Sequence, residues 1–260
     1  MIDFIRLNSF GIKRIFYFET LDSTNTYAKK ENPGNDTLIL ASYQDAGRGR
    51  MERKWDAERN KNITLSLIKE LDIDDVHLVN FYTSYILLKT LKDIIKDKGL
   101  GSGEKLSLKW PNDIVLNGRK ISGILSELID FNARPRKFII GTGVNVNQEI
   151  FPEEIRGRAT SLKLEFGADF DTNEIISSFI KNFYESIPLI HRRDMLMELW
   201  RLNTDVINKK IRFRMNDSSG ETEGTVLNIE DNGGIKIKMN ANNETEKISV
   251  FYSGEISFIY

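Results

Sequence analysis

A glycine-spaced run of basic residues is the part of this sequence best suited to bind an anion. Arg48 and Arg50 alternate with Gly47 and Gly49, and Arg53-Lys54-Trp55 follows. Glycine removes side-chain obstruction, so backbone amides can approach a phosphate or carboxylate closely, and arginine offers a two-pronged donor. The run predicts an anion-binding loop, although a solvated surface loop or a nucleic-acid contact is the ordinary alternative for so short a motif.

Further motifs surround this loop in a fixed order along the chain. They are Ser23-Thr24-Asn25, Gln44-Asp45, Lys109-Trp110-Pro111-Asn112-Asp113, Arg119-Lys120-x-x-Gly123-x-Leu125-x-Glu127 and Gly141-Thr142-Gly143-Val144-Asn145. Together with the basic loop they resemble the signatures of the biotin protein ligase family over residues 23 to 147, with a weaker likeness at Ser253-Gly254-Glu255-Ile256. The resemblance implies an enzyme that adenylates biotin with ATP. The biotin would then pass to a lysine of a biotin carboxyl carrier protein domain of a carboxylase.

The resemblance also implies a catalytic set of Lys120, Arg48, Arg50 and Asp113. Lys120 would hold the biotin carboxylate and the bridging oxygen of the adenylate, where its charge offsets negative charge in the transition state. Asp113 would lie near the acceptor lysine or Mg²⁺, and both roles stay open beside a plain turn-forming one. The implied ligands of ATP and the adenylate are Arg48, Arg50, Arg53, Trp55, Asn112, Lys120 and Asn145. Among these, Arg53 is expected to face the departing pyrophosphate.

Biotin has a polar ureido ring and an apolar remainder, so its pocket needs a few directional polar groups within apolar walls. The expected biotin ligands are Ser23, Thr24, Asn25, Gln44, Gly47, Arg48, Lys120, Gly123 and Leu125. Ser23-Thr24-Asn25 also suits a helix cap before Tyr27, and the two roles are compatible.

The chemistry of the implied reaction agrees with the residue types. Joining a carboxylate to the α-phosphate of ATP brings two anions together, so cations must surround both, here Arg48, Arg50, Lys120 and Mg²⁺. We expect the substrate phosphates to hold the Mg²⁺, with Asp113 a possible ligand, and we predict no other metal site. With no cysteine in the chain, thiol-nucleophile mechanisms are excluded, and His77 and His191 lack metal-ligand spacing.

The composition of the chain also bears on its partners and its location. A formal net charge of −1 gives no overall attraction to DNA or to anionic membranes. No apolar run approaches the roughly 20 residues of a membrane span, and the start of the chain lacks a secretory signal, so we expect a soluble, cytoplasmic protein. Because Ser23 lies near the start, we expect a monofunctional form without an N-terminal DNA-binding domain.

The pattern of elements predicts an α+β (mixed α/β) fold. Strands are expected at 13–18, 37–43, 62–68, 113–116, 120–128 and 137–146, and helices at 75–98, 173–187 and 190–203. Asn117-Gly118 is typical of a two-residue hairpin turn. The family resemblance implies a central mixed sheet flanked by helices, similar to the catalytic domains of class II aminoacyl-tRNA synthetases and biotin ligases.

After Asn203 the chain changes to short strand-like runs separated by turns such as Asn216-Asp217 and Asn242-Asn243. We therefore predict a catalytic domain over 1–207 and a small SH3-like β-barrel over 208–260. Two competing functions stay open. One is a lipoate or other acyl-adenylate-forming protein ligase, and the other is an RNA-binding module that uses the barrel and the basic loop. A homodimer is possible.

Overall fold

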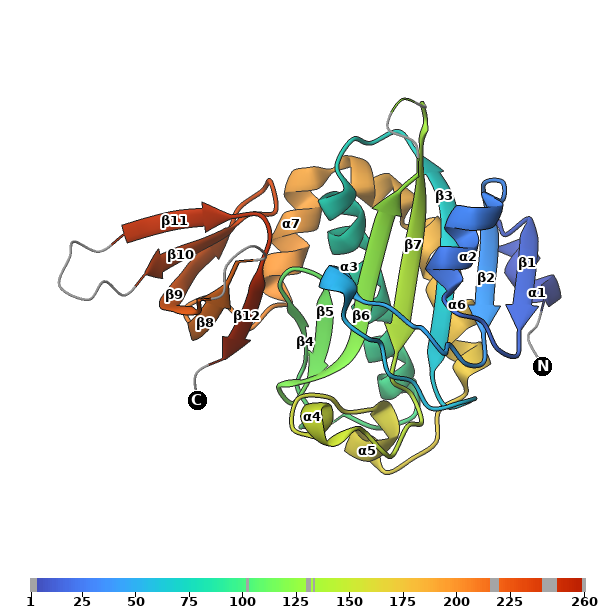
Figure 1. Ribbon diagram of the computed structural model, residues 1–260, viewed down its shortest axis with the longest axis horizontal. Coiled ribbons are helices and arrows are strands. Elements are labelled where there is room, and N and C mark those ends of the chain that lie inside the picture. The colour runs from blue at the N-terminus through green and yellow to red at the C-terminus, as the bar shows by residue number, and fades with distance from the viewer. Residues whose placement is uncertain are drawn as a thin grey trace.

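The computed structural model describes residues 4–101, 103–129, 132, 134–215, 220–239 and 247–258. Its centre is a seven-stranded sheet in the order β1-β2-β3-β7-β6-β5-β4 (Figure 1). The strands are β1 (Arg14–Phe18), β2 (Thr37–Ala41), β3 (Ile63–Leu71), β4 (Leu106–Lys109), β5 (Asp113–Leu116), β6 (Arg119–Leu128) and β7 (Arg136–Val144). Only β1 and β2 pair in parallel within this sheet, so the predicted mixed sheet is confirmed.

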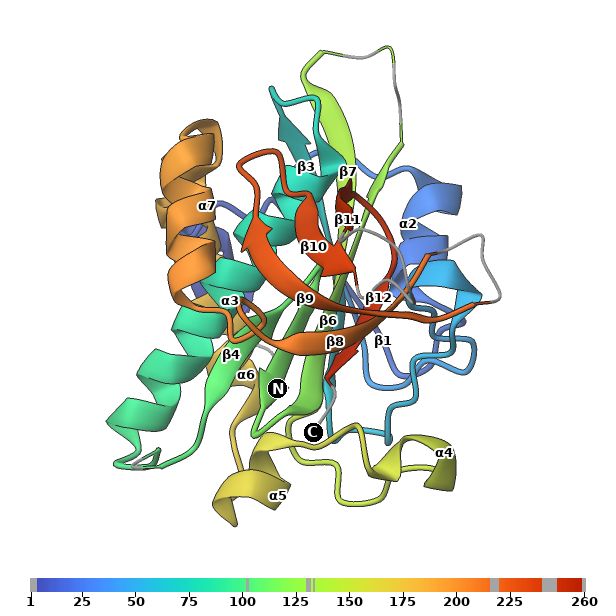
Figure 2. The same ribbon diagram turned by 90° about the vertical axis from the view of Figure 1, so that its left-hand side faces the viewer.

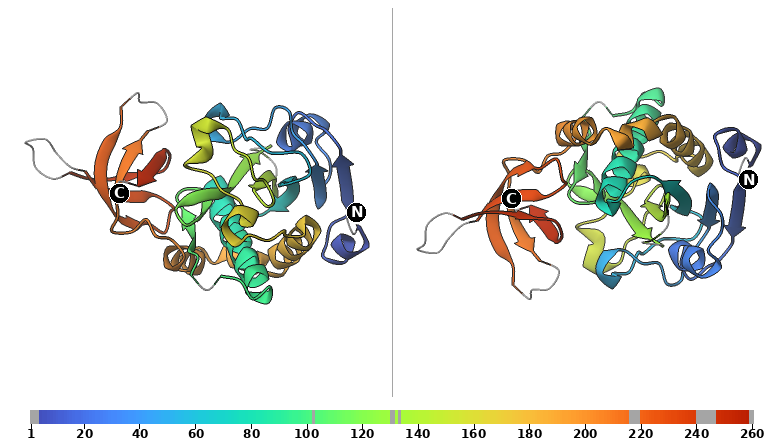
Figure 3. Two further views of the ribbon diagram at one scale, coloured as in Figure 1. Left: turned by 90° about the horizontal axis from the view of Figure 1, so that it is seen from below. Right: turned by 90° about the horizontal axis from the view of Figure 1, so that it is seen from above.

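Helices cover the two faces of this sheet unequally. One face carries α3 (Val76–Asp97), α6 (Thr172–Glu185) and α7 (Arg193–Leu202) over the main core. The other face carries α2 (Thr24–Glu31) and the basic loop, as the two views of Figure 3 show. Adjacent strand residues point to opposite faces, so Leu38 lies in the main core and Ile39 under α2. The sheet therefore leaves the surface beside α2 available for a site.

The long helix α3 begins and ends where its sequence indicates. The Asp75 carboxylate accepts hydrogen bonds from the backbone N–H groups of His77 and Leu78, which caps the first turn. Gly99 follows the helix with a φ of 69°, a conformation that glycine adopts without strain. The prediction of a helix over 75–98 is confirmed. Trp200, on α7, is fully buried and packs edge-on against Phe81 of α3 at a centroid distance of 5.1 Å.

A second sheet of five antiparallel strands follows, in the order β11-β10-β9-β8-β12. Its strands are β8 (Lys210–Arg214), β9 (Thr222–Ile229), β10 (Ile235–Met239), β11 (Lys247–Phe251) and β12 (Glu255–Phe258). The indole N–H of Trp110, before β5, donates to the carbonyl of Gly233 at 3.0 Å and so ties the two sheets together. Figure 2 shows the small sheet from its outer side, with the large sheet behind it. The boundary at 207/208 stays a prediction, and the turns expected at 216–217 and 242–243 lie outside the described residues.

The hairpin at Asn117-Gly118 is confirmed, with φ values of 51° and 79°. The elements that sequence patterns had not indicated are short: α1 (Phe4–Ser9), β4, α4 (Glu153–Arg156), α5 (Leu162–Phe166) and the 3₁₀ turns η1 (Arg50–Glu52) and η2 (Ile187–His191). Such segments show too few turns or alternations for a period to be read. None of the described helices has both the length and the apolar character needed to cross a membrane.

Candidate active site

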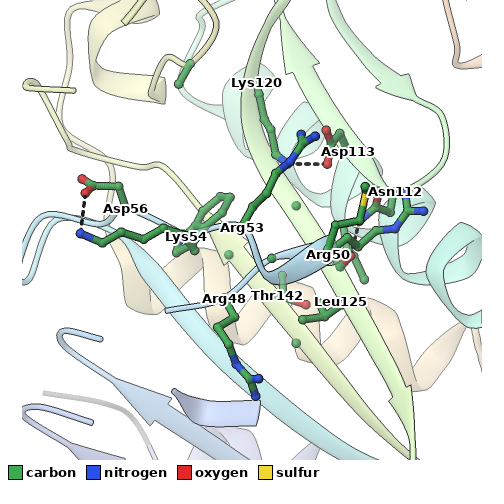
Figure 4. Close-up of a pocket in the computed structure, with 18 of the residues that line it drawn as sticks. Arg48, Arg50, Arg53, Lys54, Asp56, Asn112, Asp113, Lys120, Leu125 and Thr142 are labelled. Carbon is green, nitrogen blue, oxygen red and sulfur yellow. Dashed lines mark hydrogen bonds and ion pairs between the residues drawn. The ribbon is translucent and has the colours of Figure 1, made fainter. Parts of the chain in front are cut away.

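A cavity of about 530 Å³ opens on the face of the large sheet that carries α2 and the basic loop (Figure 4). Strands β3, β6 and β7 form its floor, and β8 and β12 of the second sheet reach its rim. Every site residue predicted from the sequence lines this cavity except Gly47. A side chain at Gly47 would meet the Trp55 carbonyl oxygen at 2.8 Å, so this glycine permits the close packing of the loop.

The ammonium group of Lys120 lies 2.6 Å from the Asp113 carboxylate (Figure 4). A shift in the pairing of β5 with β6 explains how they meet. Asp113 pairs with Gly123, but Val115 pairs with Lys120, so β6 contains one extra residue. Without this bulge, strict alternation would place Lys120 and Gly123 on opposite faces of the sheet. The bulge places both on the cavity face.

Positive charge predominates in the cavity wall. Its basic residues are Arg48, Arg50, Arg53, Lys54, Lys109, Lys120, Arg158 and Arg214, against the acidic Asp56, Asp113 and Glu255. Burial lowers the pKa of Arg50 and of Lys109, although neighbouring carboxylates oppose the shift. Arg50 also donates to the Asn112 side-chain oxygen at 3.3 Å. Such a wall attracts a ligand with several negative charges.

The basic loop folds back on itself through backbone hydrogen bonds. Gly49 N–H donates to the Arg53 carbonyl at 2.7 Å, and Trp55 N–H donates to the Gly47 carbonyl at 2.8 Å. The Arg48 guanidinium instead extends toward α2, away from Lys120, and donates to the Thr26 hydroxyl at 2.8 Å (Figure 4). The structure therefore brings Arg50 and Lys120 into the charged end of the cavity, while Arg48 reaches toward the α2 end.

Trp55 lies on a floor of glycines. A Cβ atom at Gly143 would come within 2.5 Å of the Trp55 ring, and one at Gly123 would come within 3.4 Å. The Lys120 ammonium is 5.7 Å from the centroid of the same ring. The two glycines thus let the indole approach the sheet closely.

The α2 end of the cavity is polar and buried. The Gln44 side-chain oxygen accepts from the Thr24 backbone N–H at 2.7 Å, and the Ser23 hydroxyl accepts from Thr26 N–H as the N-cap of α2. Asn25 donates to the Leu125 carbonyl at 3.1 Å and accepts from the Ser66 hydroxyl at 2.5 Å. The cap interpretation of Ser23-Thr24-Asn25 is confirmed, and the same three residues line the cavity.

Three buried polar atoms of residues that line the cavity have no hydrogen-bond partner within the described structure: Trp55 Nε1, Thr142 Oγ1 and Asn145 Oδ1. The Asn145 amide nitrogen donates to the Thr160 carbonyl at 3.1 Å, which fixes the amide and leaves its oxygen as an acceptor. Apolar side chains of Phe151, Ile155 and Ala159 form the wall beyond it.

The sequence predicted no role for several residues of the cavity, notably Arg158, Arg214 and Glu255. Glu255 lies within the weak Ser253-to-Ile256 likeness, so a signal for it existed. Arg214 and Arg158 stand in no motif, and only the packing of β8 and of the 151–159 segment against the cavity identifies them. His77 and His191 do not line the cavity.

Comparisons with known proteins agree on one family. Residues 17–145 match the model of the "Biotin/lipoate A/B protein ligase family". The chain is 31% identical over 260 residues to the "Bifunctional ligase/repressor BirA" of Bacillus subtilis, covering 95% of this chain and 76% of that protein. It is 30% identical to the "Biotin--[acetyl-CoA-carboxylase] ligase" of Mycobacterium tuberculosis, covering 75% and 71%. A solved structure of the biotin protein ligase of Aquifex aeolicus with biotin and ATP superposes with a TM-score of 0.77 at 26% identity, covering 95% and 98%.

Proposed function

The chain belongs to the biotin/lipoate A/B protein ligase family, and from that premise we propose that it is an ATP-dependent biotin protein ligase. The observation that carries the proposal is the arrangement of one cavity with two different ends. Buried polar groups of α2 and Gln44 lie at one end, and Lys120, Arg50 and Lys109 lie at the other. A ligand with a neutral polar head and an anionic tail fits this polarity, and biotin has that form.

In the first reaction, a carboxylate oxygen of biotin attacks the α-phosphorus of ATP. The bond from that phosphorus to the β-phosphate oxygen breaks, and pyrophosphate leaves with the released electron pair. Lys120 bears its charge where the two anions meet, and Arg50 adds a second charge from the loop. Because both cations are fixed before reaction, the stabilisation requires little reorganisation.

In the second reaction, the neutral ε-amine of the carrier lysine attacks the carbonyl carbon of biotinoyl-AMP. The carbon–oxygen bond to the phosphate breaks, AMP leaves, and the amine gives up a proton. Asp113 is the carboxylate at the charged end of the cavity beside Lys120, so we assign it to orient that amine and accept the proton.

The α2 end suits the ureido ring of biotin. Helix α2 presents its N-terminus there, and partial positive charge at a helix N-terminus favours an oxygen acceptor. The Gln44 oxygen is held by Thr24 N–H, which leaves the side-chain amide as a donor. Gly123 and Leu125 bound the adjoining floor.

The adenine base of ATP suits the wall that contains Asn145. The unpartnered Asn145 Oδ1 can accept a hydrogen bond from the exocyclic amino group of adenine, whereas guanine presents an oxygen at the same place. Trp55 and the apolar wall at Phe151 and Ile155 offer surfaces for the base.

Mg²⁺ would accompany the triphosphate and neutralise part of its charge. The described residues contain no group of three side chains that could hold a metal. Asp113 is paired with Lys120, and Glu255 with Arg53 and Arg214. The ion would therefore be held mainly through phosphate oxygens, and Asp113 is the carboxylate that would be its protein ligand. The carrier domain of a carboxylase as acceptor, and a homodimer, stay predictions.

Exchange of labelled pyrophosphate into ATP tests the proposal. We expect exchange that requires biotin, followed by transfer of biotin to a purified carrier domain and not to the same domain with its acceptor lysine replaced by arginine. Exchange driven by lipoate or octanoate but not by biotin would overturn the assignment.

A further inference from the structure

The second sheet contributes a pair of charged side chains to the cavity. Arg214 on β8 and Glu255 on β12 are direct cross-strand partners, and the Arg214 guanidinium lies 3.0 Å from the Glu255 carboxylate. The same carboxylate also pairs with Arg53 of the basic loop, using both of its oxygens. All three residues line the cavity. In Figure 1, β12 lies on the side of the small sheet nearest the large sheet, and β8 is the strand paired with it.

The charges of this trio do not cancel. One carboxylate lies between two guanidinium groups, so the cluster retains a net positive charge. Burial alone would raise the pKa of Glu255, but hydrogen bonds from Arg53 and Arg214 lower it below its ordinary value, so the carboxylate stays ionised at neutral pH. The side chains of Arg53 and Arg214 remain 46% and 41% exposed, so an entering anion can reach both.

The family resemblance already implies that Arg53 faces the departing pyrophosphate. We propose that Arg214 joins Arg53 in binding the pyrophosphate portion of ATP, and that Glu255 holds the two guanidinium groups in place until the phosphates displace it. This inference rests on the proposed ligase function. A pyrophosphate group carries more negative charge than one carboxylate and can accept from both arginines at once, so it competes well for them. The second sheet thereby completes the active site rather than only adjoining it.

The proposal makes opposite predictions for the two partners on β8 and β12. Arg214→Ala removes a ligand, so the KM for pyrophosphate in biotin-dependent exchange should rise roughly tenfold or more, and the KM for ATP with it. Glu255→Gln removes the competing negative charge but keeps the shape, so the KM for pyrophosphate should fall severalfold. A purely structural contact would make both variants worse.

Arg212→Ala is the matched control, because Arg212 lies two residues away on β8, pairs with Glu223 and does not line the cavity. The KM values of this variant for pyrophosphate and ATP should match those of the unaltered chain. Arg214→Lys keeps a charge without the two-pronged geometry, and should fall between Arg214→Ala and the unaltered chain.

Transfer of biotin from purified biotinoyl-AMP to a carrier domain separates a phosphate role from a folding defect. Pyrophosphate has already departed at this stage, so Arg214→Ala should transfer at the normal rate. Equal KM values for Arg214→Ala and Arg212→Ala would overturn the inference, and so would a slower transfer step or a rise in KM for Glu255→Gln. If the unaltered chain showed no biotin-dependent exchange, the proposed ligase function itself would be overturned.

Discussion

Lys120 and Asp113 form an ion pair of 2.6 Å because a bulge in β6 turns Lys120 onto the cavity face of the sheet. A carboxylate beside a cation at the reacting centre supplies both charges that the two half-reactions need. In the proposed mechanism, the cation serves the joining of two anions, and the carboxylate serves the later attack by an amine. The first two predictions separate these roles.

Lys120→Ala should slow formation of biotinoyl-AMP about 100- to 1000-fold, which is the usual loss when one fixed group that stabilises developing charge is removed. Biotin-dependent pyrophosphate release under single-turnover conditions measures this step. Lys89→Ala is the control, because Lys89 lies on the exposed side of α3 and pairs with Asp93. An unchanged rate for Lys120→Ala would remove Lys120 from the catalytic set.

Asp113→Asn should impair the transfer step about 100-fold, within the usual range for a lost general base, and change adenylation only a fewfold. The transfer step is measured from purified biotinoyl-AMP and a carrier domain, with no ATP or Mg²⁺ present. If Asp113 instead serves mainly to hold Mg²⁺, transfer will be normal while adenylation requires more Mg²⁺, and the assignment as base is wrong.

Gly143→Ala should displace Trp55 from the floor of the cavity, because the added Cβ would lie 2.5 Å from its ring. Overpacking of this kind costs about 1 to 3 kcal/mol, so we expect the KM for ATP to rise roughly tenfold. Trp110 and Trp200 are buried, so increased quenching of tryptophan fluorescence by acrylamide would report on Trp55. Gly103→Ala is the control, since nothing lies within 4 Å of its Cβ position.

Asp36→Asn should destabilise the fold at neutral pH. The Asp36 side chain is 8% exposed, and its carboxylate binds Lys13 at 2.8 Å, Lys69 at 2.5 Å and the Tyr184 hydroxyl at 2.9 Å. Removing one member of a buried ion pair costs about 3 to 5 kcal/mol. Asparagine tolerates the positive φ of 59° at this position, so the loss of stability would come from the missing charge and not from backbone strain.

The effect of Asp36→Asn should depend on pH in a defined direction. Burial alone would raise the pKa of Asp36, but its hydrogen bonds and the two lysines lower it below the ordinary 3.8. The stabilisation is therefore fully present above pH 3.8, the ordinary value, and is lost as the pH falls through the folded-state pKa. The free energies of unfolding of the two chains, measured in urea, should converge as the pH falls into the acid range. A difference that stays constant down to low pH would contradict this prediction.

The sequence predicted the elements that have a long run of regular apolar spacing or a characteristic turn sequence. Helix α3 was predicted from its apolar spacing, and the β5–β6 hairpin from Asn117-Gly118. Residues of the cavity were anticipated where motifs carried them. What the motifs could not show is that a bulge in β6, a property of strand pairing, sets the direction of Lys120. Nor could they place Arg214, which reaches the cavity only through the packing of a second sheet.

Mass spectrometry of the small-molecule products would show directly whether the chain adenylates biotin. The chain is incubated with ATP, Mg²⁺ and either biotin, lipoate or octanoate, and the acyl-adenylates are extracted and compared. We expect biotinoyl-AMP in an amount comparable to the enzyme, dependent on both biotin and ATP, with far less of the other two adenylates. Finding no biotinoyl-AMP, or a larger yield of lipoyl-AMP or octanoyl-AMP, would contradict the proposed function.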